Sequence, residues 1–445
     1  MRWISVAALA LAVACGGSSR VENDRDGGGE GGRDGGAEPL PTGPILERSA
    51  ALTHDCTGAL GVTHEFGKIT GRAYVATDDA AFGVSLVSAA TVAQWFPTDD
   101  ISLQIAPVAE DGSLGAPAVV GIGEGERTNL SATALGETFL AVWVEDGELM
   151  SAAFASDGTV RSGPHTLHDL DTTFGALEVV ATGDESALVF WGKLSGGVTG
   201  VTQLFVLAVD RDGRASGAPR VAIDLGAWFA PPRPAFVAVD GGVVYLYAKP
   251  TEGGGTMHFG RLDASGAAVG DEVQIAEVGP RFLGFAFDRV ALLPQGEGFL
   301  AAWADSSPAE NIDGEAWTMV EIARLDADGA VVDGPHVLTP PVVDIDYVEP
   351  ALFTYGDAVA LTWGRGDHIY VCAGCVPNHD VELVLLDPVR LAPVSEVARI
   401  LAAPTGGGLL RRRHVVSGAH IATSFEVTFH VTDRYAEGTL SCAAR

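Results

Sequence analysis

Short apolar runs that end in a large side chain recur along this chain, and a glycine precedes most of them. Seven of these runs align on their last residue: Trp95, Trp143, Trp191, Tyr247, Trp303, Trp363 and Phe425. In the run 299–303, FLAAW, alternate residues of a strand would point to opposite faces, and the residues of both sets are apolar. The pattern therefore predicts strands that are covered on both faces.

Each aligned run lies inside a longer repeat. An apolar run and a glycine turn come before it, and a variable stretch, a third apolar run, an Asp/Gly turn and a fourth run come after it. The aligned residues are between 48 (Trp95 to Trp143) and 62 (Trp363 to Phe425) positions apart. Long periods of this kind are typical of radial repeats, so the pattern predicts one four-stranded antiparallel sheet per repeat.

Sheets with two apolar faces are covered when they pack face to face around an axis. A two-layer sandwich would bury one face of each sheet and would show stricter alternation of apolar and polar residues. The seven repeats therefore predict an all-β fold, a seven-bladed β-propeller of four-stranded antiparallel blades over residues 51–445. The pattern resembles the β-propeller superfold in its architecture, without the signature of a particular propeller family, and architecture alone implies no function.

The N-terminal segment MRWISVAALALAVAC carries one cation, Arg2, then an apolar run too short to span a bilayer, then small residues before Cys15. Its end, LAVAC, resembles the lipobox of bacterial lipoproteins. The resemblance implies a signal peptide over residues 1–14, a lipid on Cys15, and export to the cell envelope, at the outer membrane or the cell surface. An ordinary signal peptide with an unmodified Cys15 is the alternative. Residues 15–50 are rich in glycine and predict a flexible acidic tether.

Acidic residues outnumber basic ones, 58 to 27, and the formal net charge is −31. Such a charge repels nucleic acid and anionic membrane surfaces, so we expect no nucleic-acid partner and membrane contact through the N-terminal lipid alone. The chain contains no Gly-x-Ser-x-Gly, His-Glu-x-x-His or phosphate-binding loop. The sequence therefore favours a binding protein over an enzyme, and it predicts no cofactor.

The last repeat has little room for a fourth strand, so a strand from residues 50–77, for example GRAYVAT at 71–77, is expected to complete the last blade. Beside the lipidation candidate, four cysteines remain, and they allow three pairings. An exported protein permits disulfides. Because two of the cysteines lie near the two ends of the folded body, ring closure favours the pairs Cys56–Cys442 and Cys372–Cys375.

Insertions concentrate between the second and third predicted strands of the repeats, at 192–202, 248–256, 304–317 and 364–380. In a propeller this connection opens at the same end as the links between blades. Insertions on one face of a repeat protein often mark its partner side. We therefore expect a binding scaffold whose looped rim takes an unknown protein or carbohydrate ligand; the alternative is that these loops vary freely in length.

Charged residues recur 14 positions before the aligned aromatic, and they are Arg233, Arg289 and Arg411, with Glu349 at the same offset in another repeat. This offset corresponds to the start of the innermost strand, at the mouth of the central channel. Guanidinium groups on rigid strands can bind a carboxylate or phosphate through two hydrogen bonds. The alternative is that each arginine pairs with an acidic residue on its own rim.

The stretch HIYVCAGCVPNH has the spacing His-x3-Cys-x2-Cys-x3-His, with His368, Cys372, Cys375 and His379. Four such side chains could hold a tetrahedral zinc ion. In an exported protein the two cysteines could instead form a disulfide or remain free thiols, and the compartment favours the disulfide. The turns DRDG and DADG begin like calcium loops, but further oxygen ligands are missing, so ordinary hairpin turns are expected.

Three carboxylates, Asp344, Asp346 and Glu349, fall in a predicted link between blades, at the looped rim. Paired carboxylates can act as the acid and the base or nucleophile of a glycosidase. A propeller glycoside hydrolase or lyase that uses rim carboxylates is therefore the alternative to the binding scaffold.

Overall fold

The computed structural model describes residues 44–444, apart from residues 49, 65–68, 78–79, 89–100, 124–126, 171–173, 195–200, 226–233, 252–253, 280–289, 307–317, 339–341, 343–344, 368–378, 402–406, 418–419 and 430–432. The chain divides into two compact units, Met1–Leu40 and Pro41–Arg445, and every described residue belongs to the second. Among the described residues, no helix has the length and apolar character needed to cross a membrane.

The described residues form seven four-stranded antiparallel sheets, which we number as blades 1 to 7. In the order of hydrogen bonding, blade 1 is β2 (Ile69–Ala76), β3 (Ala81–Ser88), β4 (Ile101–Val108) and β5 (Ala118–Gly123); blade 2 is β6 (Arg127–Leu135), β7 (Thr138–Glu145), β8 (Glu148–Ala155) and β9 (Val160–Asp169); blade 3 is β10 (Phe174–Gly183), β11 (Ser186–Leu194), β12 (Val201–Asp210) and β13 (Arg220–Asp224). Blade 4 is β14 (Ala235–Val239), β15 (Gly242–Thr251), β16 (Gly254–Asp263) and β17 (Val273–Val278); blade 5 is β18 (Val290–Gln295), β19 (Gly298–Ser306), β20 (Thr318–Leu325) and β21 (Val331–Val337). Blade 6 is β22 (Ile345–Tyr355), β23 (Ala358–Asp367), β24 (His379–Leu386) and β25 (Ala398–Leu401); blade 7 is β26 (Gly407–Ser417), β27 (His420–Phe429), β28 (Asp433–Ala444) and β1 (His54–His64).

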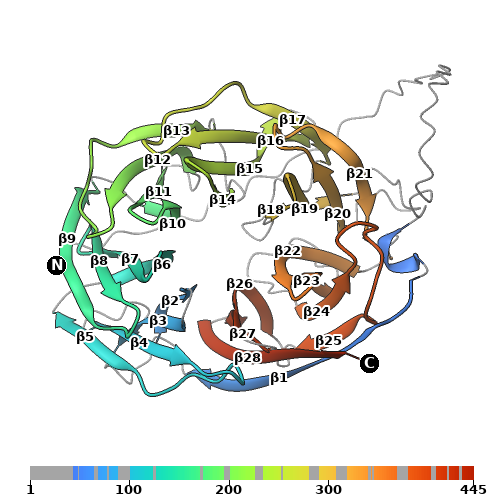
Figure 1. Ribbon diagram of the computed structural model, residues 1–445, viewed down its shortest axis with the longest axis horizontal. Coiled ribbons are helices and arrows are strands. Elements are labelled where there is room, and N and C mark those ends of the chain that lie inside the picture. The colour runs from blue at the N-terminus through green and yellow to red at the C-terminus, as the bar shows by residue number, and fades with distance from the viewer. Residues whose placement is uncertain are drawn as a thin grey trace, which may run out of the picture. The chain divides into compact units, whose positions relative to one another are not determined.

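The seven blades surround a central axis, and the first strand of each list lies nearest the centre (Figure 1). The innermost strands of blades 2 and 3 are joined by side-chain hydrogen bonds. The Ser131 and Thr133 hydroxyl oxygens of β6 accept from the backbone N–H groups of Val179 and Ala181 of β10, at 3.1 and 3.3 Å. The predicted all-β fold, a seven-bladed β-propeller of four-stranded antiparallel blades, is confirmed.

The aligned aromatic is the sixth residue of the second strand in blades 2 to 7, for example Trp143 in β7 and Trp303 in β19. In blade 1 the sixth residue of β3 is Leu86, which is fully buried. The alignment of Trp95 with the other aromatics is therefore wrong, since the second strand of blade 1 ends at Ser88 and Trp95 lies outside the described residues.

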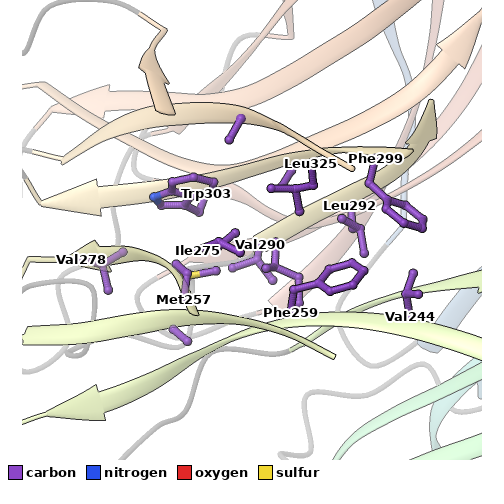
Figure 2. Packing of buried hydrophobic residues seen from close by; sticks show 14 residues of the cluster. Val244, Met257, Phe259, Ile275, Val278, Val290, Leu292, Phe299, Trp303 and Leu325 are labelled. Carbon is purple, nitrogen blue, oxygen red and sulfur yellow. The ribbon is translucent and has the colours of Figure 1, made fainter. Parts of the chain in front are cut away.

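Both faces of the second strand are buried against neighbouring blades, as the FLAAW pattern predicts. Figure 2 shows Trp303 and Phe299 of blade 5 packed with Met257 and Phe259 of blade 4. The alternate residues of the same strand, such as Leu300, instead belong to a cluster shared with blade 6. Each sheet is thus an apolar layer between two others, and burial of this surface is the main stabilising term of the fold.

Asp/Gly hairpins connect the third and fourth strands at one end of the blades. In blade 4, Asp263 Oδ1 accepts hydrogen bonds from the N–H groups of Ser265 and Ala267, at 2.8 and 3.0 Å, and Gly266 adopts φ +76°. The turns of blades 3 and 5 are capped in the same way, by Asp210 and Asp326. In blades 1 and 2 the capping aspartate stands two positions later in the turn, and Asp111 and Asp157 each accept from the N–H of the residue after the turn glycine. These carboxylates therefore cap their own turns, which is ordinary hairpin chemistry.

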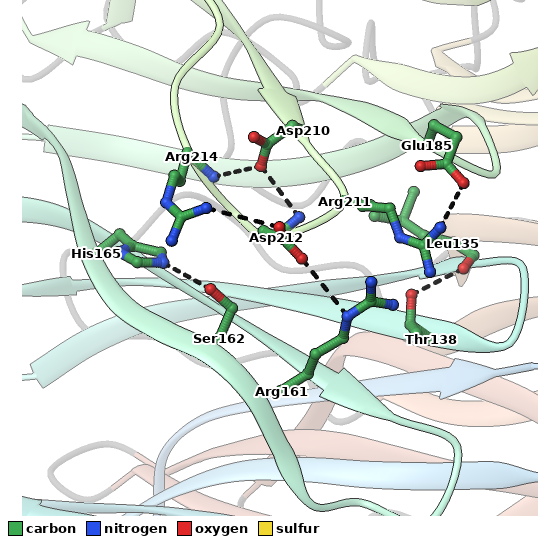
Figure 3. Close-up of polar contacts among 10 residues, drawn as sticks. All are labelled: Leu135, Thr138, Arg161, Ser162, His165, Glu185, Asp210, Arg211, Asp212 and Arg214. Carbon is green, nitrogen blue, oxygen red and sulfur yellow. Dashed lines mark hydrogen bonds and ion pairs between the residues drawn. The ribbon is translucent and has the colours of Figure 1, made fainter.

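The same turns fasten each blade to the blade before it. The hydroxyl of Ser151 in blade 2 is buried and donates to the carbonyl oxygen of Gly213 in the blade 3 turn, at 2.5 Å. Figure 3 shows the neighbouring ion pair, in which Arg161 Nε lies 3.5 Å from an oxygen of Asp212. In blade 5, Gly329 packs directly against the ring of Phe259 in blade 4. The glycines of these turns therefore serve both the turn geometry and the contact between blades.

A strand from the N-terminal side completes blade 7. β1 pairs with β28, Cys56 faces Cys442 in the register, and the two are joined by a disulfide. This is the pairing that ring closure favours. The closing strand lies in the predicted range 50–77, but the example GRAYVAT is wrong, because residues 71–76 belong to β2, the innermost strand of blade 1.

The residues before β1 pack on the propeller. Ile45, in a short 3-10 helix (Ile45–Glu47), is fully buried in the cluster between blades 5 and 6, and Leu46 N–H donates to the Leu338 carbonyl at 2.9 Å. Arg48 Nη1 donates to the Leu391 carbonyl of blade 6 at 3.1 Å. The tether predicted over residues 15–50 therefore does not extend through this packed segment, and the rest of it, together with residues 1–14, lies outside the described residues.

Candidate functional site

Second-to-third strand connections and the links between blades leave each four-stranded sheet at the same end, which we call the looped end. One predicted insertion is wrong, because residues 252–253 alone join β15 to β16, so 248–256 is a tight hairpin. The other three are shorter than predicted, and they are the connections 195–200, 307–317 and 368–378, outside the described residues. The connection 89–100 of blade 1, between its second and third strands, is a further long connection at this end, and the sequence pattern did not indicate it.

A tryptophan and two acidic residues lie together at the looped end of blade 5. Trp303 and Glu321 are cross-strand partners, and the indole Nε1 donates to Glu321 Oε2 at 2.9 Å. Asp305, two residues further along β19, is 5% exposed and accepts a hydrogen bond from the N–H of Gly279 in blade 4, at 2.7 Å. Burial, and then the negative charge of Asp305, raise the pKa of Glu321 to about 7, although the bond from Trp303 lowers it. This glutamate therefore exchanges a proton near neutral pH.

Blade 6 has the same pair with a different neighbour. Trp363 Nε1 donates to Glu382 Oε2 at 2.9 Å, again across the second and third strands. The residue two positions after the tryptophan is Arg365, and its Nη1 lies 3.6 Å from Glu382 Oε1. Burial raises the pKa of Glu382, while Arg365 and the bond from Trp363 lower it. The place that holds a negative charge in blade 5, Asp305, thus holds a positive one in blade 6.

Aromatic–glutamate hydrogen bonds also occur in blades 2 and 4. In blade 2, Trp143 Nε1 donates to Glu145 Oε2 at 3.0 Å. In blade 4, Tyr245 and Tyr247 donate their hydroxyls to the two oxygens of Glu272, at 2.9 and 2.8 Å, and burial followed by the bond to Glu272 raises the pKa of Tyr247. The aromatic residue at the sixth position of the second strand therefore donates to a glutamate in four blades.

The offset of 14 residues before the aligned aromatic coincides with β-bulges of innermost strands. The register shifts next to Asn129 in β6, Glu349 in β22 and Arg411 in β26. Asn129 and Glu349 adopt φ 51° and 49°, in the left-handed region that non-glycine residues rarely occupy, and Glu349 is 2% exposed. Because a bulge changes the direction of a side chain, this offset marks a position where the innermost strand departs from regular alternation.

The structure describes part of the sequence-predicted site. Arg411 lies at a bulge, but its side chain, like those of Asp346 and His379, is outside the described residues. Residues wholly outside them are Cys15, Arg233, Arg289, Asp344, His368, Cys372 and Cys375. The channel-mouth anion site, the zinc site, the second disulfide and the lipidation therefore stay predictions; for the anion site, a bound anion whose affinity survives Arg289→Ala and Arg411→Ala would contradict it.

The sequence analysis missed Asp305, Glu321 and Glu382. A signal was present, because TMVEIARL and HDVELVLL each place one glutamate within an otherwise apolar run. In a strand buried on both faces, such a glutamate must find a hydrogen-bond donor. The charged residues that shift the pKa values of these glutamates, Asp305 and Arg365, lie in the adjacent strand, and they are found only once the strand register is known.

The fold is similar to that of several solved structures. The β-propeller domain of the Trilobed protease from Pyrococcus furiosus matches with 8% identity and a TM-score of 0.42, over 84% of this chain and 93% of that one. A thermostable family-43 glycoside hydrolase matches with 13% identity and a TM-score of 0.33, over 63% of this chain and 96% of that one. The subtype N11 neuraminidase-like protein of a flat-faced bat influenza virus matches with 10% identity and a TM-score of 0.40, over 91% and 97%.

With identities below 25% and TM-scores below 0.5, these likenesses indicate no function for this chain. No protein-family model matches the chain, and no curated protein matches it in sequence.

Proposed function

We propose that this chain is a binding scaffold that takes its ligand at the looped end of blades 5 and 6. The observation that supports this is the placement of ionisable groups in two adjacent blades, where the half-buried Glu321 with the buried Asp305, and the half-buried Glu382 with Arg365, flank the connections 307–317 and 368–378. Ionisable groups with shifted pKa values cluster at functional sites, and loops on a rigid scaffold carry most binding residues.

The chemistry of this end suits a ligand rich in hydrogen-bond donors. Carboxylate oxygens accept from hydroxyl and amide groups, and the net charge of −31 disfavours polyanions. A carbohydrate or a protein surface fits this description, and the proposal is a binding role with no chemical step.

Shortening the connection of blade 5 tests this role. Replacing residues 308–316 by two glycines is expected to weaken binding at least about 10-fold, since the loop beside the carboxylate pair is removed. Ligands would be sought on a glycan array and by capture of cell-envelope proteins. The matched control removes the same number of residues from the connection 89–100 of blade 1, on another side of the ring, and should leave binding within about 2-fold. Equal binding by both variants and the unaltered chain would contradict the proposal.

A glycoside hydrolase or lyase is the second candidate, and one observation favours it. Glu321 has a pKa of about 7 beside the carboxyl of Asp305, which resembles the division of roles between a general acid and a second carboxylate. On a panel of glycosides, turnover abolished by Glu321→Gln would identify this pair, whereas turnover abolished by Asp346→Asn would identify the predicted rim carboxylates. Two of these, Asp346 and Glu349, lie in β22 of blade 6, so their predicted place in a link between blades is wrong. Binding without turnover would contradict the hydrolase and support the binding scaffold.

We further propose that Cys15 carries the lipid and that the chain is held in the bacterial envelope. The LAVAC motif and the glycine-rich stretch after it support this. Cys15→Ser is expected to move the protein from the membrane fraction to the soluble fraction, and mass spectrometry of the mature N-terminus would show whether Cys15 is acylated. A mature N-terminus at another residue would refute the anchor.

A further inference from the structure

We propose that Asp305 and Glu321 form a pH-sensitive contact between blades 4 and 5, which holds while Glu321 is protonated and loosens when Glu321 loses its proton. This device is independent of any ligand at the looped end. Its parts are the bond from Trp303 to Glu321, the bond from Gly279 to Asp305, and the apolar face of blade 4 opposite them.

The pair faces blade 4. Cross-strand partners point to the same face of a sheet, and Trp303, the partner of Glu321, packs in the cluster between blades 4 and 5. The residues that blade 4 contributes to this cluster near Trp303 are Met257, Ile275 and Val278, as Figure 2 shows. A negative charge at Glu321 is therefore placed against apolar side chains.

One charged residue of blade 4, Arg261, faces blade 5: it is the register partner of Val244, lies near the Asp/Gly turn of blade 5 and donates to the Ala327 carbonyl there. The charged residues nearer to Glu321 stand on the other face of blade 4. Lys249 and Glu277 are both register partners of Thr256, the residue next to Met257, so all three point away from blade 5. His258 is the partner of Tyr247, which packs toward blade 3.

The other neighbours of β20 also leave Glu321 without a facing cation in the part of the chain that the structure describes. On β21, His336 is the partner of Ile322, which faces blade 6, and it lies 2.6 Å from Asp333. β22 packs on that same blade 6 side. The charged group that acts on Glu321 is thus Asp305.

Deprotonation of Glu321 places a second negative charge beside Asp305 in an apolar interface. Since the pKa of Glu321 is raised from 4.5 to about 7, the folded chain binds more protons than the unfolded chain between these values. The stability contributed by the pair is therefore complete below pH 4.5 and is lost as the pH rises through about 7. Because Asp305 also binds Gly279, the loss acts on the start of the link from blade 4 to blade 5.

Blade 6 supplies an internal control. Glu382 occupies the place of Glu321 and accepts the same bond from its tryptophan, but Arg365 stands where blade 5 has Asp305. The charge of Arg365 favours the ionised form of Glu382, although burial and the negative charge of Asp380 still leave the pKa of Glu382 raised. The pKa of Glu382 is also raised by burial, so a pH response of the same sign is expected from it, but a smaller one than from Glu321.

The experiment compares the full chain with Glu321→Gln and Glu382→Gln. Glutamine keeps an acceptor for the tryptophan and mimics the protonated acid. At pH 5 the melting temperature of Glu321→Gln should equal that of the unaltered chain, and at pH 8 it should be higher by about 4 °C. The Glu382→Gln variant should show a smaller rise between the two pH values, because Arg365 opposes the shift in the pKa of Glu382. As a second readout, hydrogen exchange of the Gly279 amide should be faster at pH 8 than at pH 5, after correction for intrinsic exchange, and this difference should vanish in Glu321→Gln.

Two results would overturn the inference. One is a lower melting temperature of Glu321→Gln by the same amount at both pH values, which would make Glu321 a purely structural acceptor. The other is a Gly279 amide whose corrected exchange does not change with pH in the unaltered chain.

Discussion

Replacing Cys56 and Cys442 together by alanine is expected to lower the free energy of unfolding by about 5 kcal/mol. The disulfide closes a loop of 386 residues, and the chain-entropy cost of opening a loop increases with its length. It also joins β1 to β28, the contact that completes the ring. Denaturant unfolding of the oxidised protein would measure the loss.

A matched control lies one residue away on the same two strands. Thr57 and Ser441 face each other beside the disulfide, with their hydroxyl oxygens 3.5 Å apart and exposed. Thr57→Ala should therefore change the free energy of unfolding by less than about 0.5 kcal/mol. If the double cysteine variant unfolds at the same denaturant concentration as the Thr57→Ala variant, the disulfide does not stabilise the ring.

The blade architecture was predictable because both alternating sets of side chains in the second strands are apolar. Strands such as FLAAW are apolar on both faces, and only packing between two neighbours buries both. Blade 1 is misaligned for a physical reason: its second strand places Leu86 where the other blades have an aromatic residue, so the alignment falls on the next tryptophan along the chain, Trp95. Leucine fills the same buried position without the marker that the alignment used.

The closing strand was harder to place, because β1 is an outermost strand with one neighbour in its sheet. Its sequence, HDCTGALGVTH, begins with polar residues that alternate between exposed and half-buried positions. The more apolar stretch ITGRAYVA is an innermost strand and therefore gives the stronger signal. The cysteines located the closure correctly because a disulfide depends on chain connectivity and not on burial.

The candidate site could be predicted only in part. Loop length and charge spacing are visible in the sequence, and they point to the looped end and the channel mouth. The difference between Glu321 and Glu382 depends on the residue two positions after a tryptophan in the adjacent strand. That neighbour determines whether burial of the glutamate is opposed by a cation, and it is known only from the strand register.

Gly329→Ala is expected to lower the free energy of unfolding by about 2 to 5 kcal/mol. Gly329 adopts φ +86°, which costs a residue with a side chain about 1 to 2 kcal/mol. Its Cβ would also overlap Cδ1 of Phe259, a ring that is itself buried between blades 4 and 5 against Phe299. Overpacking of this kind costs about 1 to 3 kcal/mol.

The equivalent glycine of blade 2 separates these two costs. Gly158 adopts φ +81°, but a Cβ there would lie 3.4 Å from Ile105, at ordinary contact distance. Gly158→Ala should therefore lower the free energy of unfolding only by the cost of the left-handed backbone conformation, about 1 to 2 kcal/mol. Combining Gly329→Ala with Phe259→Leu makes room for the methyl group, so the two losses should sum to more than the loss of the double variant. Additive losses, or equal losses for the two glycines, would show that the turn of blade 5 is not seated on blade 4.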